Sequence, residues 1–464
     1  MPEVILASPT PDFTADVVII GAGASGLTAA LAAAENGSEV VVLERDASPS
    51  GSTSMSSGFV PAPGTRFQHS IGVTDDTAEL FFGDLKAKAY GKLDERLARL
   101  AAENIAPAME WLADKCGVEW HVLDDFLYPG HARHRMHAVP EKTGAALEAR
   151  LLAAAAAAGI TIVTEALAET LFFDEEGKAV AVGLKRPGDT TEVIGCRNLI
   201  LACNGYGGNQ KLVAEHIPEI AGVQYYGHAG NTGHALTWGE ALGAEIKHLS
   251  GYQGHGSLAH PHGILISWAL MMQGAIQLNS EGCRFSNEMG GYSEQAVKVL
   301  NQPDGIAWNI YDAQRHNFLV NGFPDYCEAV EAGAIHCGAD AVELAKVTGL
   351  PELALASTLA EVQALAGGVS SDALGRDFTG VTPLKAPYYA VKVTGVLFHT
   401  QGGLVIDSTA RVHRADGGTF MNLYASGGAA CGVSGPAVEG YLSGNGLLTA
   451  IAFGYLAGRN ASVA

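Results

Sequence analysis

The stretch Val17-Val18-Ile19-Ile20-Gly21-Ala22-Gly23-Ala24-Ser25-Gly26-Leu27 decides how this chain folds. Its apolar start predicts a buried strand, and its three spaced glycines predict a tight turn into a helix. The first glycine permits the turn, the second lets the backbone approach a pyrophosphate, and the third lets the helix pack on the strand. The N–H groups at the start of such a helix attract phosphate oxygens. We therefore predict a dinucleotide-binding turn.

A second apolar run, Val40 to Leu43, predicts the next strand of the same sheet, and it ends at Glu44. This spacing is the one expected for a carboxylate that binds a ribose, and a glycine turn in an unrelated α/β sheet would not explain it. The loop from Ser50 to Gly58 follows. Its small hydroxylic residues suit close contact with a cofactor, and a flexible linker is the alternative interpretation.

The composition is that of a large globular enzyme. The chain has 464 residues, 48% of them hydrophobic, which suits about two or three domains. With 28 basic and 49 acidic side chains, we expect neither nucleic acid nor an anionic membrane as a partner. The seven cysteines show no paired spacing, and the sequence has no signal-peptide pattern and no apolar run long enough to cross a bilayer. These features predict a cytoplasmic protein.

The order of the elements predicts an α/β fold with an inserted α+β domain. Residues 225–384 are rich in glycine, histidine and aromatic residues and lack the strand–helix alternation of a Rossmann fold, so we interpret them as a substrate (capping) domain. They include a helical segment at 339–366. We expect residues 1–224 and 385–464, which end in a helix at 446–458, to form one Rossmann-like cofactor domain.

Further motifs follow in order along the chain. They are Gly230-Asn231-Thr232-Gly233, Gly282-Cys283-Arg284-Phe285-Ser286-Asn287-Glu288, His399-Thr400-Gln401-Gly402-Gly403 and Gly440-Tyr441-Leu442-Ser443-Gly444-Asn445-Gly446. Together with the N-terminal turn and the serine-rich loop, they resemble the fumarate reductase/succinate dehydrogenase flavoprotein family over nearly the whole chain. The resemblance implies FAD, with a capping domain inserted between two halves of the FAD-binding domain.

The resemblance also implies which residues contact FAD. The expected cofactor-binding residues are Gly21, Gly23, Ala24, Ser25, Gly26, Glu44, Arg45, Ser52, Thr53, Ser54, Ser57, Gly58, Ala202, Asn204, Gly205, Gly402, Gly427, Gly428, Gly444, Asn445 and Leu447. No histidine occurs in the serine-rich loop, where covalent family members attach the flavin, so we expect non-covalent FAD. The histidines around His255 match no zinc spacing, and we predict no metal site.

The chain departs from fumarate reductases at the residues that hold a dicarboxylate. His255 and Arg284 resemble two members of that clamp, whereas Phe398 and Tyr441 replace a histidine and an arginine, with His399 adjacent to the first. A phenyl ring and a neutral phenol cannot offset the cost of burying a second carboxylate, which is several kcal/mol. Fumarate reduction is therefore disfavoured. Gly428 also stands where the family usually has a glutamate on the ribityl chain.

The C-terminal motif resembles instead that of the ketone-desaturating 3-ketosteroid dehydrogenases, the Δ4 type in particular. Tyr441-Leu442-Ser443-Gly444 matches their Tyr-x-Ser-Gly, and Tyr292 corresponds to a second tyrosine, displaced by one residue. The resemblance implies hydride transfer from the carbon β to a carbonyl to flavin N5 while the α-proton leaves. We predict that Tyr441 donates to the developing enolate oxygen. A tyrosine bonded to the start of the last helix is the alternative.

The base that takes the α-proton is open among Tyr292, Ser443, His255 and Arg284. We favour Tyr292 over His255, with Ser443 as a possible relay. Arg284 is interpreted as a proton donor, as a clamp for a substrate carboxylate, or as an ion pair with Glu288. Phe398, His399, Tyr441 and Arg284 are the expected substrate-binding residues.

These residues predict an FAD-dependent dehydrogenase that introduces a double bond next to a ring ketone. A retained Arg284–His255 pair and a ketone-binding Tyr441 suit a small ring with both a ketone and a carboxylate, such as an oxocyclohexanecarboxylate. A 3-ketosteroid is the competing substrate, and the electron acceptor is unidentified. Reduction of an activated C=C bond by a fumarate-reductase-like flavoprotein is the alternative activity, and an oxidoreductase subunit that needs a partner is a third.

Overall fold

The computed structural model describes residues 2–368 and 371–462. The chain divides into two compact units. Unit 1 comprises Met1–Asp124, Gly130–Gln253 and His399–Ala464, and unit 2 comprises Asp125–Pro129 and Gly254–Phe398. The main segment of unit 2, Gly254–Phe398, therefore starts and ends later than the sequence pattern suggested at 225 and 384. It starts later because α7 (His234–Leu242) packs on strands of unit 1, and it ends later because β17 (Tyr388–Thr400) pairs in the sheet of unit 2.

The main sheet of unit 1 has the strand order β1-β8-β9-β10-β2-β3-β7, and β20 pairs with β10 and with β19. These strands are β1 (Glu3–Leu6), β2 (Phe13–Ile20), β3 (Val40–Leu43), β7 (Thr161–Val163), β8 (Leu167–Phe173), β9 (Ala179–Lys185), β10 (Thr191–Leu201), β19 (Arg411–His413) and β20 (Thr419–Ala425). The parallel strands β2, β3, β10 and β20 end in register, because Ile20 pairs with Leu43 and Leu201, and Leu201 pairs with Ala425. The segments after these strands consequently lie at one edge of the sheet, where α/β proteins bind ligands.

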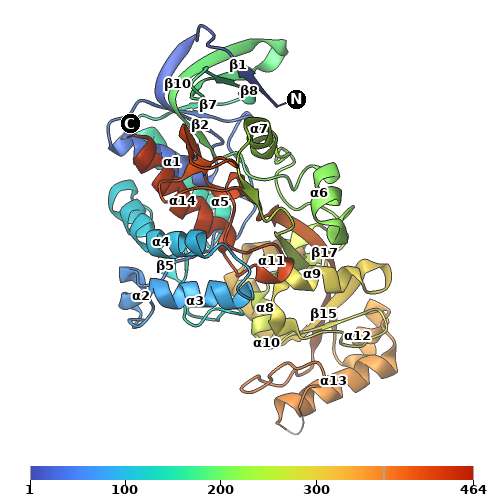
Figure 1. Cartoon of the computed structure of the whole chain (residues 1–464). Coiled ribbons are helices and arrows are strands. Elements are labelled where there is room, and N and C mark those ends of the chain that lie inside the picture. Colours follow the sequence, from blue (N-terminus) through green and yellow to red (C-terminus); the bar gives the residue numbers. More distant parts are fainter. Residues whose placement is uncertain (1, 369–370, 463–464) are drawn as a thin grey trace. The chain divides into compact units, whose positions relative to one another are not determined.

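The first and last helices pack directly on each other, as the blue α1 (Ala24–Glu35) and the red α14 (Asn445–Ala461) show in Figure 1. Glycines on α14 permit this approach. A Cβ atom at Gly454 would lie 2.5 Å from the carbonyl oxygen of Ser25, and one at Gly458 would lie 2.1 Å from that of Ala29. The two ends of the sequence therefore pack together in unit 1.

Apart from α7, the other helices of unit 1 begin at polar caps. In α4 (Glu95–Cys116), Asp94 accepts from the N–H groups of Arg96 and Leu97, and the helix ends at Gly117 with φ of 68°. The remaining elements of unit 1 are α2 (Arg66–Ser70), α3 (Ala78–Lys88), α5 (Gly144–Ala157), α6 (Gln210–His216), β4 (Val60–Pro61), β5 (His121–Val122), β6 (Met136–Ala138), β11 (Ile246–Lys247) and β18 (Gly403–Leu404).

Unit 2 contains an antiparallel sheet of order β13-β12-β17-β15-β14, with β16 also paired to β17. Its strands are β12 (Tyr252–Ala259), β13 (Ile264–Leu265), β14 (Ile276–Leu278), β15 (Ile306–Asp312), β16 (Ile335–Gly338) and β17 (Tyr388–Thr400). Its helices are α8 (Ala269–Met272), α9 (Tyr292–Leu300), α10 (Ala313–Gly322), α11 (Pro324–Glu331), α12 (Ala341–Thr348) and α13 (Glu352–Ala366). The helical segment expected at 339–366 is thus two helices, because Gly349 (φ of 76°) and Pro351 interrupt it.

Glycines bring the sheet of unit 2 against α9. A Cβ atom at Gly254 on β12 would lie 2.7 Å from the carbonyl oxygen of Ser293, and one at Gly395 on β17 would lie 2.3 Å from that of Ala296. This close packing places Tyr292, the first residue of α9, beside the two strands.

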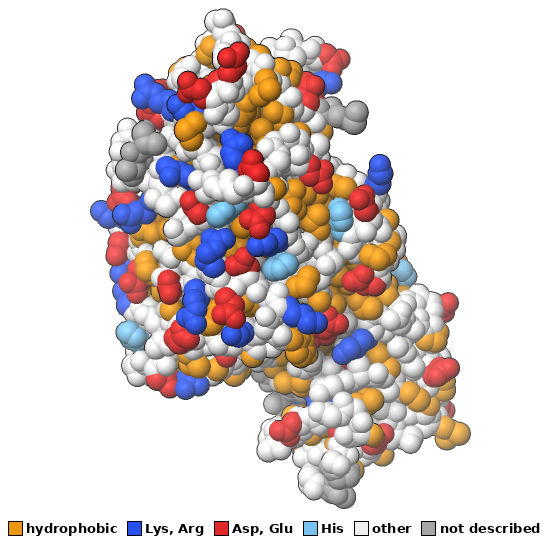
Figure 2. Space-filling view, viewed as in Figure 1, with side chains coloured by type: hydrophobic (Ala, Val, Ile, Leu, Met, Phe, Trp, Pro, Cys, Tyr) orange, Lys and Arg blue, Asp and Glu red, His pale blue; other side chains and the backbone are white. Residues whose placement is uncertain are grey.

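Charges of both signs are mixed on the surface. On the face in view, Figure 2 shows lysine and arginine side chains interspersed with aspartate and glutamate. None of the helices in the part of the chain that the structure describes is long and apolar enough to cross a bilayer.

Candidate active site

The turn after β2 requires glycine at two positions. Gly21 has φ of +108°, and a Cβ atom there would lie 2.5 Å from the carbonyl oxygen of Ala202. A Cβ atom at Gly26 would lie 1.9 Å from the carbonyl oxygen of Gly21. The turn is therefore as tight as the sequence predicted.

The carboxylate of Glu44 is fixed at the end of β3. One of its oxygens accepts from the N–H of Ala22 at 3.1 Å, and the other accepts from the N–H of Asp46 at 3.1 Å. The side chain is buried, and the adjacent Arg45 donates to the carbonyl of Gly230 at 2.8 Å. A rigid acidic group next to the glycine turn fits the ribose-binding role predicted for Glu44.

The serine-rich loop is bonded to the segments that end the neighbouring strands. The hydroxyl of Ser52 accepts from the amides of Asn204 (3.2 Å) and Asn231 (2.8 Å). The hydroxyl of Thr53 accepts from the N–H of Ala24 at 3.0 Å. The structure thus brings together the turn, the loop and two motifs that are distant in the sequence. An ordered loop of this kind fits the cofactor interpretation better than a flexible linker does.

Gly428 makes room for Asn204. A Cβ atom at Gly428 would lie 2.2 Å from the amide oxygen of Asn204, which itself accepts from the N–H of Gly205 at 2.8 Å. A glutamate at 428 is incompatible with this position of Asn204, which gives a physical reason for the departure from the family pattern.

Every cofactor-binding residue predicted from the sequence lies in unit 1. Two buried polar groups at these segments fit a cofactor. The amide oxygen of Asn445, at the start of α14, has no hydrogen-bond partner among the described residues, and neither has one carboxylate oxygen of Glu148 on α5. Burial raises the pKa of Glu148 to about 7. Unpaired buried acceptors are costly, so donors of a bound dinucleotide would stabilise them. The residues present therefore fit FAD.

Tyr441 lies in the segment that leads into α14. Its phenol oxygen accepts from the N–H of Gly446 at 3.4 Å, which is the helix-start bond that the sequence analysis gave as an alternative role. The ring of His399 lies edge-on to it, with centroids 5.5 Å apart. The carbonyl of the following Ser443 accepts from Nε2 of His131 at 3.0 Å. The motif is thus buried and anchored on both sides.

An ion-pair cluster that the sequence did not reveal lies behind this motif. Arg135 is fully buried, contacts Asp76 at 2.8 Å and Asp84 at 2.5 Å, and lies 3.5 Å from Nδ1 of His131. Burial lowers the pKa of His131 to about 3, so its ring is neutral. Because Nε2 of His131 donates to the carbonyl of Ser443, this cluster fixes the position of Ser443.

In unit 2, the ring of His255 is stacked between two other predicted residues. The centroid of Tyr292 is 4.8 Å away at an interplanar angle of 28°, and that of Phe398 is 5.1 Å away at 17°. Trp268 and Tyr128, which the sequence reasoning missed, lie edge-on to His255 and Tyr292 respectively. Neither belongs to a motif, so no sequence signal marked them. The indole N–H of Trp268 is buried without a partner among the described residues.

The hydrogen bonding of His255 fixes its tautomer. The backbone N–H of Ser257 donates to Nδ1 at 3.1 Å. Since an N–H group can only donate, Nδ1 is unprotonated and the neutral ring carries its proton on Nε2. Burial lowers the pKa of His255 to about 3. His255 is therefore a neutral hydrogen-bond donor.

Arg284 lies in a separate buried cluster of ion pairs. Its guanidinium donates to both oxygens of Glu288 (2.9 and 2.8 Å) and to both oxygens of Asp372 (2.9 and 3.1 Å). Arg376 also contacts Glu288, at 3.1 Å. The ion pair with Glu288 was the structural alternative named for Arg284, and the structure contains it. A substrate role for Arg284 stays a prediction.

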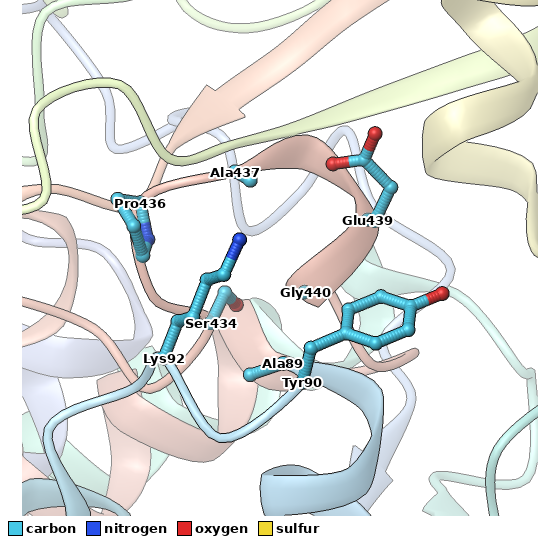
Figure 3. Close-up of a pocket in the computed structure, with 8 residues that line it drawn as sticks. All are labelled: Ala89, Tyr90, Lys92, Ser434, Pro436, Ala437, Glu439 and Gly440. Atoms are coloured by element: carbon cyan, nitrogen blue, oxygen red, sulfur yellow. The ribbon is translucent and has the colours of Figure 1, made fainter.

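A cavity of ≈ 310 Å³ lies in unit 1 beside the Tyr441 motif. Figure 3 shows its lining residues, which are Ala89, Tyr90, Lys92, Ser434, Pro436, Ala437, Glu439 and Gly440. The ammonium of Lys92 and the carboxylate of Glu439 give its walls opposite charges, and the buried Ser434 is one of its inner residues. The sequence did not predict this cavity, since its residues come from two loops far apart in the chain.

The profile of the FAD binding domain family matches residues 16–447. The chain belongs to this family. It is 29% identical over 459 residues to "Probable fumarate reductase Ifc3" of Shewanella frigidimarina (strain NCIMB 400), covering 97% of this chain and 75% of that protein. It is 25% identical over 551 residues to 4-oxocyclohexanecarboxylate 2-dehydrogenase of Sinomonas cyclohexanicum, covering 97% of this chain and 93% of that protein.

The fold also matches a solved structure along its whole length. The 3-ketosteroid-Δ4-(5α)-dehydrogenase of Rhodococcus jostii RHA1 aligns with a TM-score of 0.77 at 24% identity, covering 99% of both chains. These matches confirm the predicted fold class, the cofactor FAD and an FAD-dependent oxidoreductase. Non-covalent attachment of the FAD stays a prediction.

Proposed function

We propose that this enzyme is a ketone dehydrogenase, which removes two hydrogens from the carbons α and β to a ring carbonyl. The observation that carries the proposal is Tyr441, whose buried phenol contacts the first turn of α14 and which stands in the sequence where fumarate reductases have a dicarboxylate-binding arginine. The relative from Sinomonas cyclohexanicum, which by its name oxidises a ring keto acid, supports it. FAD, when bound, supplies the acceptor for the hydride.

Tyr441 has the role of polarising the substrate carbonyl. Its oxygen accepts the N–H of Gly446, and accepting one hydrogen bond strengthens the phenol as a donor of another. A donor at the start of a helix also benefits from the positive end of the helix dipole when negative charge develops on the enolate oxygen.

Tyr292 has the role of taking the α-proton. His255 is unsuited to it, because Nε2 already carries a proton and Nδ1 is occupied by the N–H of Ser257. Tyr292 stacks on the neutral His255 and begins α9, where the helix start favours a phenolate. Ser443 is the proposed relay.

The proposed substrate is a cyclic ketone or keto acid, with a 3-ketosteroid as the competing class. The aromatic cluster of Tyr128, His255, Trp268, Tyr292 and Phe398 offers flat apolar surfaces that suit a carbon ring. Within this cluster, the donors of His255 and Trp268 suit an oxygen acceptor on the ring.

Reduction of an activated C=C bond is the second candidate. The likeness to the Shewanella relative favours it, and so does His255, because a neutral N–H donor also suits a carboxylate of an unsaturated acid. Tyr441 opposes it, since a phenol lacks the charge that a dicarboxylate needs.

An anaerobic titration separates the two candidates. The purified yellow protein is mixed with cyclic ketones, keto acids, 3-ketosteroids and succinate while the flavin absorbance is recorded. Bleaching by a saturated ketone is the expected result, and the most effective compound identifies the substrate class. If no ketone bleaches the flavin, but dithionite-reduced protein is reoxidised by fumarate or another activated alkene, the dehydrogenase proposal is wrong.

A further inference from the structure

A chain of buried hydrogen bonds in unit 1 ends at His399. The amide of Asn445 donates to the hydroxyl of Ser434 at 2.8 Å, and this hydroxyl contacts the amide oxygen of Gln401 at 2.6 Å. The amide nitrogen of Gln401 lies 3.0 Å from Nδ1 of His399. Gln401, Ser434 and Asn445 are 4%, 1% and 0% exposed, so these bonds are shielded from bulk water. Each contact therefore constrains the next.

We propose that Gln401, held by Ser434 and Asn445, is a positioning residue that fixes the proton of His399 on Nε2, so that the ring donates to an anionic oxygen of the substrate. The inference rests on the proposed function. Neither Gln401 nor Ser434 was predicted from the sequence as a site residue.

The direction of the chain follows from the number of protons available. The Ser434 hydroxyl has one proton, and because it accepts from Asn445 it gives that proton to the oxygen of Gln401. This orients the NH₂ group of Gln401 toward His399. An amide N–H can only donate, so Nδ1 accepts and the neutral ring carries its proton on Nε2.

The surroundings of His399 keep it neutral and leave space beside Nε2. Burial lowers the pKa of His399 to about 4. A Cβ atom at Gly446 would lie 2.7 Å from Nε2, so the glycine at this position keeps the space next to that nitrogen open. Gly446 also donates its N–H to the phenol of Tyr441. The Nε2–H of His399 and the phenol of Tyr441 thus both lie beside Gly446. Two donors in this arrangement suit binding of the enolate oxygen or of a carboxylate.

One contact permits the opposite tautomer. The carbonyl of Thr400 lies 3.2 Å from Nδ1 and would accept a proton from it if the amides of Gln401 and Asn445 were both reversed. In that arrangement Nε2 would be an acceptor and would repel an enolate oxygen. The two arrangements predict different protonated nitrogens, so the nitrogen that carries the proton decides between them.

The test is the ¹⁵N spectrum of the histidine rings in the ¹⁵N-histidine-labelled holoenzyme at neutral pH. Protonated and unprotonated ring nitrogens have well-separated shifts, and the His399→Gln variant identifies the signals of His399. We expect protonated Nε2 in the wild type. In Gln401→Glu, a carboxylate accepts from Nδ1, so we expect Nδ1 to become protonated. The Gln363→Glu variant makes the same change on α13 and is expected to leave the His399 signals unchanged.

Kinetics give a second readout. Removing an oxyanion donor usually lowers the rate by about 100-fold or more. In Gln401→Glu the proton of His399 is on the wrong nitrogen, so we expect kcat/KM to fall by at least about tenfold. We also expect a new ionisation of His399 between about pH 6 and 8 in the pH profile, because a carboxylate partner raises the pKa of a histidine. Gln401→Met and Ser434→Ala, which add no charge, are expected to weaken the preference for protonated Nε2. These two variants replace Gln401→Glu in the test if that variant does not fold.

A protonated Nδ1 in the wild type overturns the inference, and so do identical His399 signals in the wild type and Gln401→Glu. The spectrum is recorded without turnover, so it is independent of the proposed function. If Nε2 is protonated but no ketone bleaches the flavin, the dehydrogenase proposal fails and the orientation of His399 stands.

Discussion

The backbone N–H of Ser257 donates a 3.1 Å hydrogen bond to Nδ1 of His255. This single bond decides what the histidine can do, because a ring whose Nδ1 is an acceptor carries its proton on Nε2. It separates His255, a donor, from Tyr292, the proposed base, although the two rings are stacked at 4.8 Å.

The first prediction concerns the base. Tyr292→Phe is expected to lower kcat by about 100- to 10,000-fold, the usual contribution of a general base, and to stop exchange of the substrate α-proton with D₂O. His255→Gln keeps a side-chain N–H donor, and we expect it to retain that exchange. The measurement is proton NMR of a ketone incubated with each variant in D₂O. Loss of exchange in His255→Gln together with its retention in Tyr292→Phe would reverse the assignment.

The second prediction concerns Tyr441. Tyr441→Phe removes the proposed oxyanion donor, and we expect kcat/KM for a ketone to fall by about 100- to 1,000-fold while the FAD absorbance spectrum changes little. Tyr455→Phe is the matched control, because Tyr455 is a tyrosine of α14 whose phenol contacts Arg459. Equal activity of the two variants would show that the phenol of Tyr441 has only a structural role.

The third prediction concerns Arg284. Because its four hydrogen bonds go to Glu288 and Asp372, Arg284→Met removes a buried cation from both carboxylates, although Arg376 still pairs with Glu288, and we expect it to destabilise the protein by about 3 kcal/mol in denaturant unfolding. If Arg284 also binds a substrate carboxylate, as the sequence predicts, the milder Arg284→Lys lowers turnover of keto acids more than turnover of neutral ketones. An equal change for both classes of substrate would show that Arg284 has only a structural role.

The sequence predicts best where the chemistry is local. The turn at Gly21, the acidic end of β3 and the start of α14 each depend on a few consecutive residues, and the structure has them where the motifs indicated. The Rossmann-like fold follows from these motifs, because they fix the strand ends around which the sheet is built.

The contacts that define side-chain roles are not local, and the sequence did not reveal them. Asp372 lies 88 residues from Arg284, and Ser434 lies 33 residues from Gln401. No spacing rule connects such pairs, since the intervening chain only returns through tertiary packing. The main segment of unit 2 is displaced for the same reason, because α7 packs on unit 1 and β17 pairs with β15 in the sheet of unit 2.

The fourth prediction concerns the attachment of the flavin. The serine-rich loop contains hydroxyl side chains bonded to Asn204 and Asn231 and no histidine. We expect acid or heat to release FAD into the supernatant of the denatured protein. The measurement is the absorbance spectrum of the supernatant and the colour of the pellet, and a washed pellet that stays yellow would show a covalent bond.

The fifth prediction is that the protein loses stability as the pH falls below about 6.5, the ordinary pKa of histidine. Burial lowers the pKa of His131 and His255 to about 3 and that of His137 and His399 to about 4. Between these values and 6.5 the unfolded chain binds protons that the folded protein excludes. Each such histidine therefore adds up to about 1.4 kcal/mol per pH unit to the loss of unfolding free energy.

Denaturant unfolding of the holoenzyme in excess FAD at pH 7, 6 and 5 measures this slope. His137→Gln is the informative variant, because His137 contacts the hydroxyl of Thr65 and the carbonyl of Arg135 and has no proposed catalytic role. We expect the variant to be less stable at pH 7 but to have a shallower slope, since one excluded proton is removed. An unchanged slope would mean that His137 takes up a proton as readily in the folded protein as in the unfolded chain.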